Sequence, residues 1–159
     1  MVESQLMRLG IVLTTALVMS IAGGAVHAKM VMQTFPVLAG AGAHDVYPAP
    51  DGGVWFTAQS AGKLGRLDPS TGKSAMIALG PGAAPHGVIV GPDGAAWVTE
   101  GGQNAIARVD PATHGVKLFP LPKGRRNADL NTAVFDRRGV ISFTGQNGIL
   151  RSTRSQDRH

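Results

Sequence analysis

Cysteine is absent from the 159 residues, and charged and aromatic side chains are scarce. Without cysteine the chain has no disulfide to hold its fold and no thiolate for catalysis. Charged residues make up 16% of the sequence, below the quarter that is usual in globular domains, and aromatic residues make up 5%. Basic residues outnumber acidic ones by 15 to 10, but they are scattered and do not alternate with aromatic side chains. This pattern argues against a nucleic-acid partner.

A long apolar run occurs only near the N-terminus, where the uncharged stretch LGIVLTTALVMSIAGGAV follows Arg8. Val26 and Ala28 then stand at the small-residue positions that precede a signal-peptide cleavage site. A membrane anchor is the alternative, although the run is near the lower limit of roughly 17 residues for a spanning helix. We predict a secretory signal peptide at 1–28, cleaved before Lys29. The protein would then be periplasmic or secreted, with no membrane attachment.

Glycine is abundant at 22 residues, and much of it belongs to an internal repeat. The segment PDGGVWFTA at 50–58 recurs as PDGAAWVTE at 92–100, so that Trp97 follows Trp55 by 42 residues. A period near 40 is typical of β-propellers and other repeat arrays. Because both copies carry the tryptophan, we predict that it packs between neighbouring repeats.

The repeat extends beyond these two segments. Upstream of them His44 aligns with His86, and a third, more divergent copy occupies 130–150. In the third copy Asn131 stands at the histidine position and Ser142 at the tryptophan position. Framework residues should recur in every copy, so positions at which the copies differ are better candidates for function.

Each copy reads as short strands separated by turns. In the second copy HGVIV, AAWVTE, AIARVD and VKLFPL have the composition or alternation of strands, and PDG and PATHG are turn sequences. No segment after Ala28 shows helical periodicity. We therefore predict an all-β fold, a β-propeller of four-stranded blades, with about three blades in a domain at 29–150. The blades are expected near 35–80, 81–124 and 125–150, followed by an irregular basic tail at 151–159.

Three blades are fewer than the four that a closed propeller needs. The sequence therefore predicts an incomplete propeller with two exposed apolar blade faces. Such faces are a liability because they leave the chain open to association with other copies.

The segment PHGVIVGPDGAAWVTE, followed by NAIARVDPATHGVKLFPLP, resembles the blade pattern of the virginiamycin B lyase family, also called streptogramin B lyases. The resemblance runs from about His44 to Ile149. It implies a seven-bladed propeller with its site at the mouth of the central channel. It also implies a carbon–oxygen lyase that opens a cyclic depsipeptide by elimination across its ester bond, assisted by Mg²⁺ and without consuming water.

The resemblance also implies site residues. The family's catalytic blade carries Glu-Pro-His and a second Glu fourteen residues beyond the His, a separation that His86 and Glu100 reproduce. His86 is thus expected to be the catalytic acid/base and Glu100 a ligand of Mg²⁺. Ala84 stands where the first Glu of the motif belongs, so one expected carboxylate is missing. His44, one repeat earlier, is expected to face the same channel and bind substrate. Because such a site is shared across a channel, we expect the three blades alone to be inactive.

The expected chemistry fits these residue types. Elimination needs a base that removes a proton α to a carbonyl, and a neutral imidazole suits that task. Two other function classes stay open: a non-catalytic propeller module that binds a peptide or small ligand, and a gluconolactonase-like hydrolase. The hydrolase needs several Glu, Asn and Asp metal ligands, and the sequence offers few carboxylates on inner strands.

Overall fold

The structure is a computed structural model that describes residues 30–122 and 127–154. The chain divides into two compact units, 1–33 and 34–159. The first is described only at 30–33, which form no helix or strand, so the predicted signal peptide lies outside the described residues. Within the part of the chain that is described, no helix is long and apolar enough to cross a membrane.

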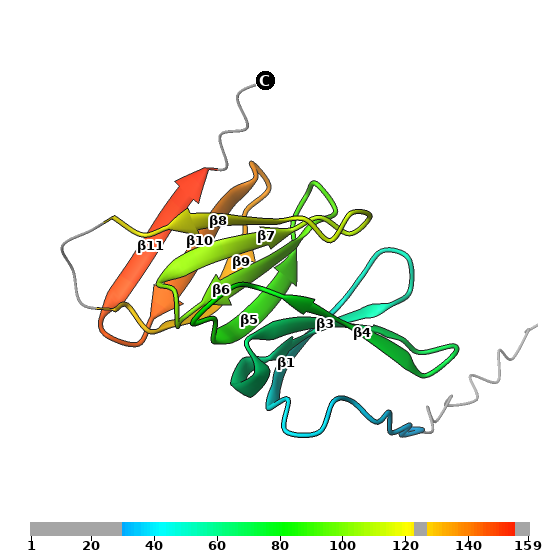
Figure 1. Ribbon diagram of the computed structural model, residues 1–159. Coiled ribbons are helices and arrows are strands. Elements are labelled where there is room, and N and C mark those ends of the chain that lie inside the picture. Colours follow the sequence, from blue (N-terminus) through cyan, green and yellow to red (C-terminus); the bar gives the residue numbers. More distant parts are fainter. Residues whose placement is uncertain (1–29, 123–126, 155–159) are drawn as a thin grey trace, which may run out of the picture. The chain divides into compact units, whose positions relative to one another are not determined.

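The second unit consists of three antiparallel sheets formed by consecutive strands (Figure 1). The first sheet contains β1 (Ala43–Pro48), β2 (Val54–Ala58), β3 (Lys63–Asp68) and β4 (Lys73–Ala78). The second contains β5 (Pro85–Val90), β6 (Ala96–Glu100), β7 (Ala105–Val109) and β8 (Val116–Pro120). The third contains β9 (Leu130–Phe135), β10 (Val140–Gly145) and β11 (Ile149–Arg154). Apart from the single 3₁₀ turn η1 (Gln59–Ala61), the described elements are strands, which confirms the predicted all-β partial propeller.

Strand register confirms the 42-residue repeat. Trp55 of β2 lies opposite Arg66 of β3, and Trp97 of β6 lies opposite Arg108 of β7. Each arginine also pairs with an aspartate in the turn before its tryptophan strand, Arg108 with Asp93 at 2.7 Å. The equivalent pair in the first blade joins Arg66 to Asp51. The repeated residues are therefore framework, as predicted.

Two apolar cores lie between successive blades. Trp55 is 1% exposed and packs with residues of the first and second sheets, including Leu64 and Val88. Trp97 is 4% exposed and packs with residues of the second and third sheets, including Leu130. Each tryptophan thus packs between its own sheet and the next one, as the repeat predicted. This burial supplies much of the hydrophobic stabilisation that holds neighbouring sheets together.

The prediction of two exposed apolar blade faces is wrong for the first blade and stays a prediction for the third. On the first blade, Phe56 is buried in a cluster with Ala41, and Phe35 packs against that cluster, so the segment before β1 covers this face. On the third blade, Ile141 and Phe143 of β10 face the Trp97 core. Side chains alternate along a strand, so the opposite face of β9 and β10 carries Thr132, Val134, Val140, Ser142 and Thr144, of which Val134 is 62% exposed.

The C-terminal segment also differs from expectation. β11 continues to Arg154, four residues into the stretch for which the sequence predicted an irregular tail. It pairs with all of β10, from Val140 opposite Arg154 to Gly145 opposite Ile149. The tight turn at Gly148, whose φ is +82°, brings the two strands together. Ladder hydrogen bonds come from the main chain and do not require an alternating side-chain pattern. Residues 155–159 lie outside the described part.

Candidate functional site

The first strand of each sheet carries a β-bulge at the same place. β1, β5 and β9 each insert one extra residue against their partners β2, β6 and β10. A bulge removes residues from the ladder and redirects their side chains. The residues just inside the three bulges are, in chain order, His44, His86 and Asn131. These are the positions that the repeat alignment singled out.

His44 and His86 come together across the first two blades. Their ring centroids lie 4.0 Å apart with the ring planes inclined at 55°. His44 is exposed, whereas His86 is half-buried. Burial of the His86 ring, and next the charge of His44, lower the pKa of His86 below its ordinary 6.5, against the smaller opposing effects of Asp129 and Asp45. At neutral pH His86 is therefore an uncharged imidazole that can accept a proton.

Glu100, at the end of β6, is completely buried. Its Oε1 accepts hydrogen bonds from the main-chain N–H of Ala84 and, at 3.3 Å, from that of Gly102. The carboxylate thus ties the loop that enters β5 to the turn that follows β6. Its Oε2 has no hydrogen-bond partner among the residues at 30–122 and 127–154. Burial raises the pKa of Glu100, and the backbone N–H groups of Ala84, Gly102 and Gln103 oppose this rise.

The residues around Glu100 do not by themselves fit Mg²⁺. This ion usually keeps several water molecules and takes one or two carboxylates. Glu100 has no exposed surface, and only its Oε2 is without a partner. Among the residues that the structure describes, no group of three or more His, Asp or Glu side chains is arranged to hold a metal. The role of Glu100 as a magnesium ligand stays a prediction.

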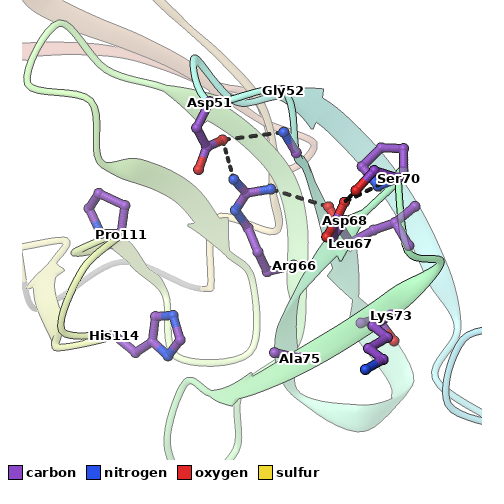
Figure 2. Close-up of a pocket in the computed structure, with 13 residues that line it drawn as sticks. Asp51, Gly52, Arg66, Leu67, Asp68, Ser70, Lys73, Ala75, Pro111 and His114 are labelled. Atoms are coloured by element: carbon purple, nitrogen blue, oxygen red, sulfur yellow. Dashed lines mark hydrogen bonds and ion pairs between the residues drawn. The ribbon is translucent and has the colours of Figure 1, made fainter.

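A hollow of about 850 Å³ lies at the opposite ends of the strands of the first blade. Its lining comes mainly from the turn after β1 and the turn between β3 and β4, whereas His44 lies near the start of β1. Figure 2 shows the guanidinium of Arg66 joined to Asp51 and to the main chain of Leu67, with His114 lying away from it. His114 is exposed.

The carboxylate of Asp68 in this hollow also accepts hydrogen bonds from residues of its own turn. Hydrogen bonds from Ser70 and Thr71 lower the pKa of Asp68 to about 2. Arg66 further lies over the ring of Trp55, 4.8 Å from its centroid. Because its arginine and both of these carboxylates serve the turns and the tryptophan, we interpret this hollow as framework. The histidine pair is the better candidate site.

Sequence reasoning missed two acidic neighbours of His86. Asp45 accepts a hydrogen bond from the N–H of Val88 at 2.9 Å, across the blade boundary. Gly87 occupies the matching position in the second copy, so this break in the repeat could have identified Asp45. Asp129 adopts a positive φ of 52° just before β9. It stands two residues before Asn131, where the second copy carries Ala84, so this difference between the copies could have identified it.

Comparison with known proteins agrees with the repeat and the fold. The sequence profile of the virginiamycin B lyase family matches residues 13–155. A streptogramin B lyase structure is 25% identical, with a TM-score of 0.66, and the match covers 75% of this chain and 39% of that one. A catalytically inactive histidine-to-alanine variant of Staphylococcus aureus virginiamycin B lyase, solved with quinupristin, is 24% identical, with a TM-score of 0.64 and coverage of 84% and 47%.

A more distant match of the same fold is the extracellular domain of a one-component system from B. thetaiotaomicron. It is 17% identical, with a TM-score of 0.54, and the match covers 71% of this chain and 14% of that domain. No curated protein matches the sequence. The chain spans less than half the length of the lyase structures that it resembles. Because the family profile matches nearly the whole length of this chain, the chain belongs to the virginiamycin B lyase family.

Proposed function

We propose that this protein is a carbon–oxygen lyase that acts on a cyclic depsipeptide of the streptogramin B class, with His86 as its acid/base. The observation that carries the proposal is the pairing of His86 with His44, whose ring centroids lie 4.0 Å apart on neighbouring blades. Family membership supplies the class of reaction and of substrate. Both imidazoles come from adjacent sheets, so this part of the site does not require a closed ring of blades. For that reason the proposal departs from the inactivity expected from the sequence, and it assigns activity to the three blades themselves.

The proposed reaction is an elimination across the ester bond of the ring. The neutral His86 imidazole removes the proton α to a carbonyl, and the electron pair of that C–H bond forms a carbon–carbon double bond. The β-carbon–oxygen bond breaks, and the ester oxygen leaves as part of a carboxylate. The ring opens without adding or losing atoms. The charge of Asp129 and Asp45 favours protonated His86, so these residues stabilise the imidazolium that the step produces.

His44 has a separate part in the proposal. It is exposed beside His86, so it can contact the substrate while His86 takes the proton. It also bears on the protonation state of its neighbour, because a positive charge on His44 disfavours a second one on His86. We assign His44 to substrate binding.

Incubation of the purified chain with quinupristin, followed by chromatography and mass spectrometry, tests the proposal. We expect a linear product that accumulates with enzyme concentration. His86→Ala should lower the rate by about 10²–10⁴, the usual contribution of an acid/base. His114→Ala is a matched control, because it removes an exposed imidazole from a turn of the same blade. Binding of quinupristin without ring opening would refute the lyase activity and favour the alternative of a non-catalytic module that binds a ligand.

We further propose that the protein is exported. The apolar N-terminal segment with its small-residue cleavage site supports export. The match to an extracellular domain is consistent with this location.

A further inference from the structure

Two threonine hydroxyls hold one peptide group of the candidate site. Thr57 is the penultimate residue of β2 in the first blade, and Thr99 occupies the same repeat position in the second; both are at most 1% exposed. The hydroxyl of Thr57 donates to the carbonyl oxygen of His86 at 2.8 Å. The N–H of Gly87 donates to the hydroxyl oxygen of Thr99 at 2.8 Å. The His86–Gly87 peptide is thus held at its oxygen by one blade and at its nitrogen by the other.

This peptide lies in the bulge of β5, between Pro85 and Val88, where the regular pairing with β6 is interrupted. The hydroxyls therefore replace ladder hydrogen bonds that the bulge has lost. Space on the other side is also restricted, because a Cβ at Gly87 would lie 2.6 Å from the carbonyl oxygen of Asn131. The next N–H along the strand, that of Val88, is held by Asp45.

The same arrangement recurs in the neighbouring blades. Thr57 accepts from the N–H of Asp45 in its own blade at 2.9 Å and donates to the next blade. Thr99 accepts from Gly87 in its own blade and donates to the carbonyl of Asn131 in the third. Thr144 stands at the equivalent position of the third blade, where it accepts from the N–H of Thr132 at 3.3 Å. Of these three threonine hydroxyls, that of Thr57 is the one that donates to the carbonyl oxygen of a histidine.

We propose that Thr57 is a positioning residue for His86. Its hydrogen bond fixes the His86 carbonyl, and with it the main-chain torsion angles that direct the imidazole toward His44. Thr57 itself has no place in the proton transfer. The proposal rests on the proposed function for its catalytic consequence, but the orientation of the ring can be measured without turnover.

The test compares Thr57→Val, which removes the hydroxyl at nearly constant volume, with Thr57→Ser, which keeps it. Thr144→Val is the matched control, since it makes the same chemical change where no histidine follows. Nuclear magnetic resonance of the imidazoles gives nuclear Overhauser contacts between His44 and His86 and the titration midpoint of His86. The charged groups that bear on this midpoint are His44 and Asp45 from the first blade and Asp129 from the third.

In Thr57→Val we expect the contacts between the two rings to weaken and the His86 midpoint to rise toward 6.5. Thr57→Ser should restore both, and Thr144→Val should change neither. If the proposed lyase activity is present, kcat should fall about 10- to 100-fold in Thr57→Val with little change in KM, because a small misplacement of the base costs rate. Unchanged ring signals in a folded Thr57→Val protein would overturn the proposal even if the enzyme is active.

The unmodified protein provides a second measurement should Thr57→Val fail to fold. A buried hydroxyl that donates to His86 exchanges slowly with water, so its proton should be visible and should show a contact to the Asp45 amide proton. A Thr57 hydroxyl proton that exchanges too fast to observe would contradict the proposal. Absent turnover with preserved ring contacts would refute the lyase function and leave the positioning role intact.

Discussion

Replacement of Trp97 by alanine should separate the second and third blades. The ring is 4% exposed, and its centroid lies 5.5 Å from those of Phe119 and Phe135. Burying such a side chain removes about 200 Å² from water, which at roughly 25 cal/mol per Å² gives about 5 kcal/mol. Replacement of buried Trp or Phe by Ala costs about 3–5 kcal/mol. We therefore expect Trp97→Ala to lower the free energy of unfolding by about 4 kcal/mol.

The indole hydrogen bond contributes little to this figure. Trp97 Nε1 donates to Asp93 at 3.1 Å, but Asp93 keeps its ion pair with Arg108 at 2.7 Å when the indole is lost. No charge is left without a partner. Trp97→Phe should consequently cost only about 1 kcal/mol for the missing hydrogen bond, plus a small loss of packing. The pair of variants separates burial from hydrogen bonding.

Urea unfolding, monitored by circular dichroism and by fluorescence, measures the free energy of unfolding of both variants. The chain has two tryptophans, so in Trp97→Ala the fluorescence reports on Trp55, between the first and second blades. In repeat folds each unit contacts mainly its neighbours, so the loss should appear first in the third blade, before Trp55 becomes exposed. A cost below about 1 kcal/mol for Trp97→Ala, or a Trp97 that is freely quenched in the native protein, would refute the assigned packing.

Mass spectrometry of the secreted or periplasmic protein should find Lys29 at its N-terminus; an intact N-terminus on a membrane-bound product would rule out the signal peptide. The pKa of His86 is lowered by folding, so its stabilising contribution should be complete above pH 6.5 and lost as pH falls below it. His86→Gln should then show a smaller drop in unfolding free energy between pH 8 and pH 5 than the parent, and an equal drop would count against the burial of His86. Glu100→Ala removes the charged acceptor of the N–H groups of Ala84 and Gly102 and should cost about 1–3 kcal/mol in urea unfolding; a neutral effect would mean that Glu100 does not hold this loop.

The sequence made the framework predictable because framework residues recur. The spacing of Trp55 and Trp97 gives the length of one blade, and their equivalent burial follows from identical strand register. His44 and His86 were predicted to face the same channel by the same reasoning. Their contact depends on the bulges of β1 and β5, which take the two residues out of the ladder. A bulge cannot be recognised from the pattern of apolar and polar residues.

The environment of Glu100 could not be predicted from sequence in the same way. The resemblance to the family's motif implied that Glu100 is a metal ligand, whereas its complete burial and its hydrogen bonds to Ala84 and Gly102 depend on how two loops fold back. Asp129 likewise reaches the site from a third blade whose copy of the repeat is poorly matched. The covered face of the first blade was missed because Phe35 lies outside the repeat.

The mass of the product formed from quinupristin in ¹⁸O-labelled water tests the central claim most directly. Elimination with His86 as base adds no water, so the account predicts a linear product with the mass of the intact antibiotic and no ¹⁸O. The product should be absent, or formed about 10²–10⁴ times more slowly, with His86→Ala. A product heavier by one labelled water would mean hydrolysis, and a ring that opens equally well without His86 would contradict the assigned base.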